Sequence, residues 1–516
     1  MNVFFLPQKI ASQFQLSLCF LFPFSGCSFE KPDSVDLARR PNVIFIMTDD
    51  HTHDQMSCAG DELTSTPGMD RLAREGIRFE NAFTTNSLCA PSRATILTGC
   101  YSAVNGIMGN SEGKNRVEKL DTSLPTFPLL LQGAGYQTGI VGKWHLPHSP
   151  RGFDYSSILP GQGVYYDPEF IENGTRKQFK GYVTDIITDQ ALEYLERTDR
   201  SKPFCLVYQH KGPHRPFTPA TRHENLYQDV EFPYPATFND DYATRKIAGK
   251  AKDMQFDISV AGDYEDLPFE LSDLDKKKWI FQRFVKDHYR SVASIDEGIS
   301  RVLDYLDDND LARNTLVIYT TDNGFFLGEH GWYDKRFMYE PAFRIPLLMR
   351  YPERIDASPV ESRMVVNVDI APTILDYACI AIPEVMQGES LAPMLDSKAD
   401  VDWRDSVYYS YYENSWALRD ASREDMSDPS FNYFTAHRIG PHRGVRTDRF
   451  KLIEYYSKSD YWEFFDLKAD PNEVNNLYMD LAYADKIAEL TLELRRLQKQ
   501  YKDVGIWERL VQPDYR

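Results

Sequence analysis

The amino-acid sequence predicts an α/β fold built around a large, mostly parallel sheet. From about residue 40, short β-branched or apolar runs alternate with amphipathic stretches of helical periodicity. Several of the apolar runs end directly in polar residues that can carry chemistry. With 516 residues, of which 42% are hydrophobic, the chain can also bury a large core. Length alone suggests two or three domains, and one large α/β domain is the alternative.

The first 26 residues have the features of an export signal. Residues 14–26 form an apolar run that is too short to span a bilayer permanently and ends in small residues. Ser25-Gly26-Cys27 resembles a bacterial lipobox, in which the cysteine is lipidated after cleavage, and residues 27–39 then form a tether. Lys9 is the only cation before the run, so a disordered or mis-started N-terminus is the alternative. We expect an exported protein, periplasmic or held at the bacterial outer membrane by lipid.

The net charge indicates which ligands and partners are disfavoured. The chain has 58 Lys and Arg against 77 Asp and Glu, a net charge of -19, which disfavours nucleic acid and gives no steering towards polyanions. An anionic ligand would therefore be bound by local contacts, in a pocket.

Few cysteines follow the signal, so we expect no dense disulfide framework. Four are expected to be buried thiols, with a single bridge left open: Cys58, Cys100, Cys205 and Cys379.

Four core strands are expected, and each is followed by a polar cluster. The strands are 43–47, 138–141, 204–209 and 316–320. The clusters are Asp49-Asp50, Lys143 to His145, His210 to His214 and Asp322-Asn323. Because ligands bind outside the carboxyl ends of strands in open α/β sheets, we expect these four clusters to converge on one crevice.

Helical periodicity and composition complete the outline. Helices are expected at 66–75, 91–98, 124–134, 184–197, 285–308 and 369–379. Residues 215–280 lack periodicity and indicate a long insertion. After about residue 385, strands at 444–455 and 461–467 precede a charged helix at 481–501. We therefore expect a catalytic domain over 40–385 and a smaller C-terminal subdomain over 386–516.

The segment 86–99 carries the most specific pattern, C-x-P-S-R followed by T-G. Pro91 suits a first helical turn, and Arg93 lies four residues after Cys89, so both side chains can point to one spot at a helix N-terminus. Such a spot favours an anion. A buried cysteine near a helix start is the plain alternative.

Oxygen ligands follow two of the predicted strands. Asp49, Asp50, Asp322 and Asn323 supply three carboxylates and an amide oxygen. Hard ligands of this kind suit Ca²⁺, with Mg²⁺ as the alternative. Taken alone, such pairs are usually solvated turns. Together with the Cys89 segment they indicate a metal site.

The motif at Cys89 resembles the signature of the type I, formylglycine-dependent sulfatases of the alkaline phosphatase superfamily. Further segments match in order over nearly all of 40–480: Gly142–Leu146 (G-K-W-H-L), Gly212-Pro213-His214, the G-x-x-D-K lysine Lys335, Gly388–Met394, Lys451–Ile453 and Glu463–Leu477. The resemblance implies a large mixed sheet flanked by helices, with a small four-stranded antiparallel sheet in the C-terminal part.

The resemblance also implies the chemistry. A dedicated maturing enzyme would oxidise Cys89 to formylglycine, whose hydrate offers one hydroxyl to attack sulfur. Deprotonating the second hydroxyl then expels sulfate, whereas a serine would leave a stable sulfate ester. An oxygen of residue 89 would join the four oxygen-bearing residues around the metal. Arg93, Lys143 and Lys335 would hold the sulfate, with His145 assigned to the nucleophile and His214 to the leaving-group proton.

Other histidines have a less defined place. His51, His53, His210 and His330 either line the pocket or cap loops.

The substrate is suggested by a loop. Residues 151–155 and 159–170 look like the N-acetylglucosamine-6-sulfatase group, which removes 6-O-sulfate from glucosamine of heparin or heparan sulfate-type glycosaminoglycans. The small, aromatic and glycine-lined loop suits exo-acting removal from one terminal sugar. Alternatives are sulfatases for iduronate 2-sulfate, galactose 6-sulfate or N-sulfoglucosamine, a phosphonate or phosphodiester hydrolase, and a glycan-binding lipoprotein without activity.

Overall fold

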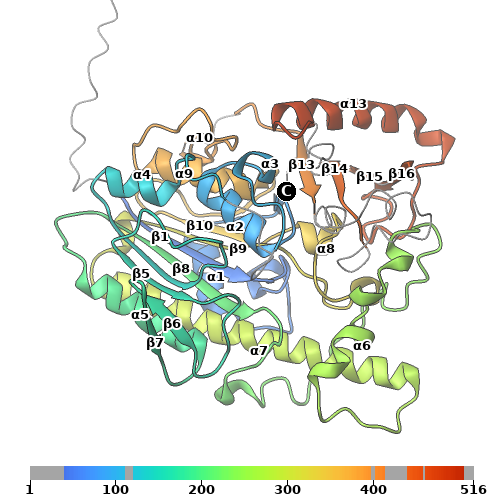
Figure 1. The fold of residues 1–516 in the computed structure, drawn as a ribbon, viewed down its shortest axis with the longest axis horizontal. Helices are drawn as coiled ribbons and strands as arrows, with labels where there is room; N and C mark the ends of the chain where they lie inside the picture. Colours follow the sequence, from blue (N-terminus) through green and yellow to red (C-terminus); the bar gives the residue numbers. More distant parts are fainter. Residues whose placement is uncertain (1–39, 111–119, 397–400, 413–438, 457–459, 505–516) are drawn as a thin grey trace, which may run out of the picture. The chain divides into compact units, whose positions relative to one another are not determined.

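A ten-stranded mixed sheet forms the centre of the chain (Figure 1). The computed structural model describes residues 40–110, 120–396, 401–412, 439–456 and 460–504. The predicted signal, tether and Cys27 lie outside the described residues. Within the described ranges, every helix is too short or too polar to span a bilayer.

The strand order is β11-β2-β10-β9-β1-β8-β4-β5-β6-β7. The bounds are β11 Ser358–Glu361, β2 Ile77–Phe79, β10 Leu347–Arg350, β9 Thr315–Thr321, β1 Asn42–Asp49, β8 Phe204–Pro213, β4 Gln137–Lys143, β5 Tyr155–Leu159, β6 Glu169–Glu172 and β7 Thr175–Gln178. The five strands β9, β1, β8, β4 and β5 run parallel to one another. Antiparallel pairs lie towards the edges, at β10 with β9 and β2, and at β5, β6 and β7.

The central strands are apolar because both faces of the sheet are covered. Every residue of β1, β8 and β9 is buried, as expected for parallel strands between two helical layers. The helices α1 (Pro67–Glu75), α5 (Val183–Arg197) and α7 (Asp273–Asp308) pack on one face, and α2 (Cys89–Thr98), α4 (Phe127–Gly133) and α9 (Ile370–Tyr377) lie on the other (Figure 1). The predicted fold class is confirmed.

The predicted insertion is shorter than expected. Helix α7 begins at Asp273 rather than at 285, because Ser272 caps it by accepting a hydrogen bond from the Asp275 amide. Before it, residues 215–272 form mostly turns, together with the short α6 (Phe256–Ser259). Other short helices are α3 (Ser102–Asn105), α8 (Glu340–Phe343) and α10 (Ala392–Asp396), and two further strands, β3 (Ala82–Phe83) and β12 (Val365–Val366), pair with each other.

A four-stranded antiparallel sheet lies in the C-terminal part. Its order is β13 (Ser406–Tyr411), β14 (His442–Thr447), β15 (Phe450–Tyr456) and β16 (Asp460–Asp466), and α13 (Ala484–Gln500) packs on it (Figure 1). The expected single strand 444–455 was wrong, since a turn at 448–449 divides it into β14 and β15. The domain boundary at 385/386 stays a prediction.

The cysteines are free thiols in the part of the chain described. Cys100 and Cys205 are buried as expected, and Cys58 is half-buried. Cys379 is exposed, so its predicted burial was wrong. It follows the end of α9 in a left-handed turn with φ 52°, which turns it away from the core.

Candidate active site

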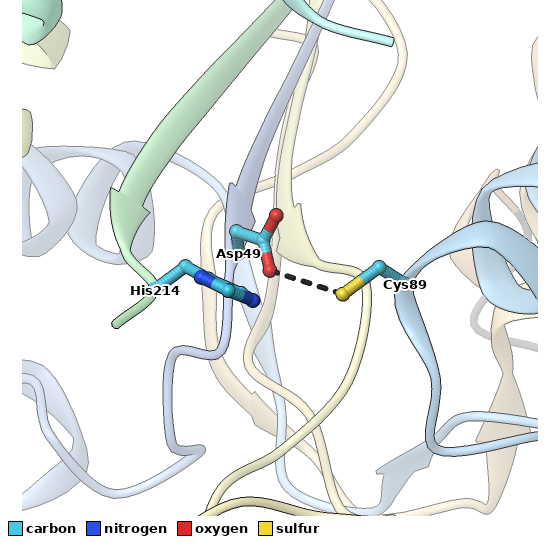
Figure 2. A group of neighbouring side chains, drawn as sticks. All are labelled: Asp49, Cys89 and His214. Carbon is cyan, nitrogen blue, oxygen red and sulfur yellow. Dashed lines mark hydrogen bonds between the residues drawn. The ribbon is translucent and has the colours of Figure 1, made fainter. Parts of the chain in front are cut away.

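The four polar clusters meet at one edge of the large sheet. Strand β1 lies between β8 and β9, and its final residue, Asp49, is level with Pro213 at the end of β8. Figure 2 shows Asp49 on β1, His214 just after β8 and Cys89 at the start of α2 directed towards one another. The expected convergence of distant sequence segments is therefore found.

Local backbone geometry brings β4 and β1 to this edge. Asp50 adopts a left-handed conformation with φ 69°, which an aspartate tolerates better than most residues and which turns the chain out of β1. In β4, Gly142 has φ +99°, and a Cβ there would lie 1.7 Å from the carbonyl oxygen of Gln209. Only glycine allows β4 to approach β8 this closely. The close approach sets the position of Lys143 beside it.

Cys89 is the first residue of α2, two residues earlier than the predicted start. The thiol donates to Asp49 Oδ1 at 3.3 Å (Figure 2). No side chain of the preceding residue caps the helix, and the Ala90 amide is bound instead by Asn110 Oδ1 at 2.9 Å. The positive end of the helix dipole therefore lies at residue 89.

Three buried cations surround Cys89. Arg93 Nε donates to Asp322 at 2.9 Å and Arg93 Nη2 to Asp49 at 3.1 Å. Lys143 Nζ pairs with Asp49. Lys335 Nζ pairs with Asp50 and lies 3.3 Å from Cys89 Sγ. Cations on several sides of one atom can neutralise an anion bound there.

The carboxylates of this cluster have pKa values that are shifted in different directions. Burial alone would raise the pKa of Asp49, but the nearby cations Lys143 and Arg93 outweigh it and hold the pKa well below its usual value. Burial raises the pKa of Asp50 to about 7, since Lys335 only partly offsets it and Asp49 and Asp322 repel the added charge. Burial and Asp49 likewise raise the pKa of Asp322. Three carboxylates this close favour a bound cation.

The residues present fit a divalent metal. Ligand atoms of Asp49, Asp50, Cys89 and Asp322 all lie within 4.8 Å of one another. Asn323 donates through Nδ2 to Asp50 Oδ1 at 2.7 Å, while its buried Oδ1 has no hydrogen-bond partner in the described chain. An unpartnered buried amide oxygen beside three carboxylates is the donor set that oxygen-preferring cations take.

The two predicted histidines each have a defined hydrogen-bond partner. His214 Nδ1 is 2.8 Å from the Arg215 carbonyl oxygen, which only accepts, so Nδ1 carries the proton and Nε2 faces Asp50 Oδ2 at 3.8 Å. Burial, and then Lys143, lowers the pKa of His214 well below its usual value. His145 is buried two residues after Lys143, with φ 55°, and its Nε2 lies 3.1 Å from the Gln162 amide nitrogen.

Comparison with known proteins identifies the family. The family described as Sulfatase matches residues 41–380, and a family described as N-sulphoglucosamine sulphohydrolase, C-terminal, matches 417–500. An N-acetylglucosamine-6-O-sulfatase of Bacteroides thetaiotaomicron is 43% identical over 90% of this chain and 87% of its own length. The chain belongs to the sulfatase family.

Further relatives agree with this assignment. An N-acetylglucosamine-6-sulfatase of Homo sapiens is 28% identical over 85% of this sulfatase and 81% of its own length. A solved structure, described as a complex with its substrate D-glucosamine-2-N,6-O-disulfate, superimposes with a TM-score of 0.81 at 42% identity, covering 91% of this chain and 99% of that one. The predicted family and the predicted sulfuric ester hydrolase class are confirmed.

Sequence reasoning missed several residues of the sulfatase site. Gln209 accepts from Arg93 Nη1 at 3.0 Å, and its place at the end of a predicted strand was the available signal. Gln162 accepts from Lys143 Nζ at 2.5 Å. Lys211 is buried 4.8 Å from the Tyr165 ring centroid. Tyr409 donates to the Arg336 carbonyl at 2.5 Å and accepts from the Ser87 amide, so it bridges the Lys335 and Cys89 segments.

The other histidines lie in the surrounding framework. His51 is buried between the Tyr319 hydroxyl and the Gln55 carbonyl, and burial lowers its pKa to about 4. His53 is half-buried beside Asp54. His210 packs on the Tyr208 ring. His330 pairs with Asp240.

Proposed function

We propose that this sulfatase removes the 6-O-sulfate of terminal N-acetylglucosamine or glucosamine in heparin or heparan sulfate-type glycosaminoglycans. The substrate class is supported by the names of its relatives, an N-acetylglucosamine-6-O-sulfatase at 43% identity and a structure with a bound D-glucosamine-2-N,6-O-disulfate. The observation that carries the chemistry is Cys89, buried at a helix N-terminus between Asp49 and Lys335.

Two groups would complete the site. Ca²⁺ would be held by Asp49, Asp50, Asp322 and Asn323 together with residue 89, and would withdraw charge from the sulfate oxygens. Conversion of Cys89 to formylglycine would supply a hydrated aldehyde, whose two hydroxyls allow attack on sulfur and later release of sulfate. Mg²⁺ is the alternative ion, because the donor set consists of the same hard oxygens.

The side chains around Cys89 would bind and orient the sulfate. Arg93 and Lys143 are fixed by Asp49, and Lys335 by Asp50, so all three are preorganised before substrate arrives. They would balance the charge of the equatorial sulfate oxygens. His214 is the proposed source of the leaving-group proton. Because its Nε2 bears a lone pair in the present hydrogen bonding, it must first take up a proton there.

The protein would depend on two further processes in the cell. A sulfatase-maturing enzyme would oxidise Cys89, reading the C-x-P-S-R sequence. An export signal over 1–26, with lipidation at Cys27, would place the enzyme in the periplasm or at the outer membrane, where sulfated oligosaccharides are met. The sequence pattern Ser25-Gly26-Cys27 supports the lipid anchor.

One experiment tests both the proposed substrate and the proposed chemistry. Desulfation of N-acetylglucosamine-6-sulfate is measured beside galactose-6-sulfate, iduronate-2-sulfate and a phosphodiester, with the mass of the Cys89 peptide determined in the same sample. Preference for the glucosamine sugar by formylglycine-bearing enzyme is expected. Preference for another sulfate ester would move the substrate assignment, and preference for the phosphodiester would overturn the proposed chemistry.

A further inference from the structure

The loop that joins β5 to β6, residues 160–168, contacts the segments of both site histidines. Gln162 lies between Lys143 and His145, and the Tyr165 hydroxyl donates to the His214 carbonyl at 2.6 Å. Lys211 packs on the Tyr165 ring from the side of β8. A loop with contacts to both histidines can control their hydrogen bonding as well as substrate specificity.

The orientation of the Gln162 amide is fixed by its neighbours. Lys143 Nζ pairs with Asp49 and is an ammonium, which only donates hydrogen bonds. The Gln162 atom 2.5 Å from it must therefore be the amide oxygen. The amide nitrogen then lies 3.1 Å from His145 Nε2, and an amide nitrogen only donates.

The proton position on His145 follows. Since His145 Nε2 accepts from the Gln162 amide, it holds a lone pair, and the proton of the neutral ring is on Nδ1. A proton taken up by His145 during the reaction must arrive at Nε2 and displace the amide. The alternative tautomer would place two N–H groups against each other, and a flipped amide would direct its own N–H groups at the Lys143 ammonium.

We propose that Gln162 is a positioning residue which, held by Lys143, keeps His145 in the tautomer with its proton on Nδ1. The inference deepens the proposed function, on which its kinetic consequence rests. It assigns a role in the reaction to the loop that resembles the glucosamine-6-sulfatase group. The tautomer itself is a property of the free enzyme and is measurable without any substrate.

The first test is ¹⁵N NMR of histidine-labelled protein at pH 8, with two-bond proton–nitrogen correlations that distinguish the tautomers. Two buried histidines serve as internal references. His51 lies against the Gln55 carbonyl through Nε2, and His442 against the Gly440 carbonyl through Nδ1, so they carry their protons on opposite nitrogens. Burial lowers the pKa of each to about 4, so both are neutral. The His145 signal, assigned with His145→Gln, is expected to match His442.

Gln162→Glu is the decisive variant, because a carboxylate of the same shape accepts from both neighbours. It should keep the Lys143 contact and move the His145 proton to Nε2. Gln500→Glu is the matched control: it makes the same change beside a cation, Arg496, in exposed α13. The control should leave the His145 signal unchanged.

Kinetics with N-acetylglucosamine-6-sulfate then separate a positioning role from a purely structural one. Gln162→Glu should lower kcat at least tenfold with a smaller change in KM, while Gln500→Glu changes neither. A proton on Nε2 of His145 in the wild type, or an unchanged tautomer in Gln162→Glu, would overturn the inference. If instead the tautomer changes as expected but this sugar is not a substrate, the inference stands and the proposed substrate fails.

Discussion

The charged cluster around Cys89 and the ion pair of Asp240 with Arg245 are both buried, yet their charges are balanced differently. Asp240 meets Arg245 and His330, and Arg245 also donates to the Val474 carbonyl at 2.9 Å. Hydrogen bonds from His330 and Arg245 outweigh burial and hold the pKa of Asp240 below its usual value. Around Cys89, three carboxylates face one another, and burial raises the pKa of Asp50 to about 7.

The difference separates charges that stabilise the fold from charges that we propose to serve the reaction. The Asp240 network joins the 237–245 segment to 330 and 474 and is internally complete. The Cys89 cluster keeps a buried amide oxygen, Asn323 Oδ1, unpartnered among the described residues, and its carboxylates repel one another. Strain of this kind is retained where a ligand relieves it. Substitutions around Cys89 should therefore lower activity more than stability, and substitutions in the Asp240 network should lower stability more than activity.

The largest effect is expected at residue 89. Cys89→Ala and Cys89→Ser should each lower kcat/KM by roughly 10⁴-fold or more, because neither side chain can form the hydrated aldehyde. Melting temperatures should change little, since the substituted side chains are small. Sulfate release and thermal unfolding are measured on the same samples. A Cys89→Ser enzyme with most of the wild-type rate would contradict the aldehyde mechanism.

The next largest loss of activity is expected at the proposed metal ligands. Asp322→Asn should lower kcat about 10²–10³-fold, because the cation supplies several kcal/mol of charge stabilisation. Asp322 accepts from Arg93 through Oδ2 and from the Asp50 and Asn323 amides through Oδ1, and an asparagine cannot accept on both sides. The metal-free variant should therefore unfold somewhat more easily than the metal-free wild type.

Calorimetry with and without Ca²⁺ tests whether the loss of activity comes from weaker binding of the cation. At a hundredfold excess over Kd, Ca²⁺ should stabilise the wild type by about 2.7 kcal/mol and the variant much less. Equal stabilisation of both proteins would remove Asp322 from the metal site.

The smallest effect on activity is expected at the ion pair of Asp240 with Arg245. Asp240→Asn should lower the free energy of unfolding by about 3 kcal/mol, because it leaves the Arg245 guanidinium buried without its carboxylate. The folded variant should keep wild-type kcat. Urea unfolding is compared with that of Asp241→Asn, an exposed neighbour whose loss should cost less than about 1 kcal/mol.

The dependence on pH shows whether charge causes the loss. The pKa of Asp240 is lower in the folded protein than in the unfolded chain, so its stabilisation is present above the unfolded pKa and is lost as pH falls towards the folded one. The stability gap between wild type and Asp240→Asn should stay constant from pH 7 to pH 5 and narrow below about pH 4. A gap that is independent of pH would point to shape rather than charge.

The sequence by itself determined the fold class and which segments carry chemistry. Short, β-branched apolar runs such as 43–47 favour buried strands, and polar residues directly after such strands are expected at the edge of the sheet. The spacing of Cys89 and Arg93 on one helix is also local, so it could be read from the chain. Local patterns of this kind survive folding because the period of a strand or helix fixes where side chains point.

Only the tertiary structure decided which groups meet. The pairing of Asp240 with His330 and the contacts of Gln162 with Lys143 and His145 join residues that are not neighbours in the chain. The sequence placed Gln162 in the predicted substrate loop, 159–170, but did not indicate which side chains it contacts. Hydrogen bonds have directions and lengths of about 3 Å, so they are defined only when the folded backbone fixes both ends.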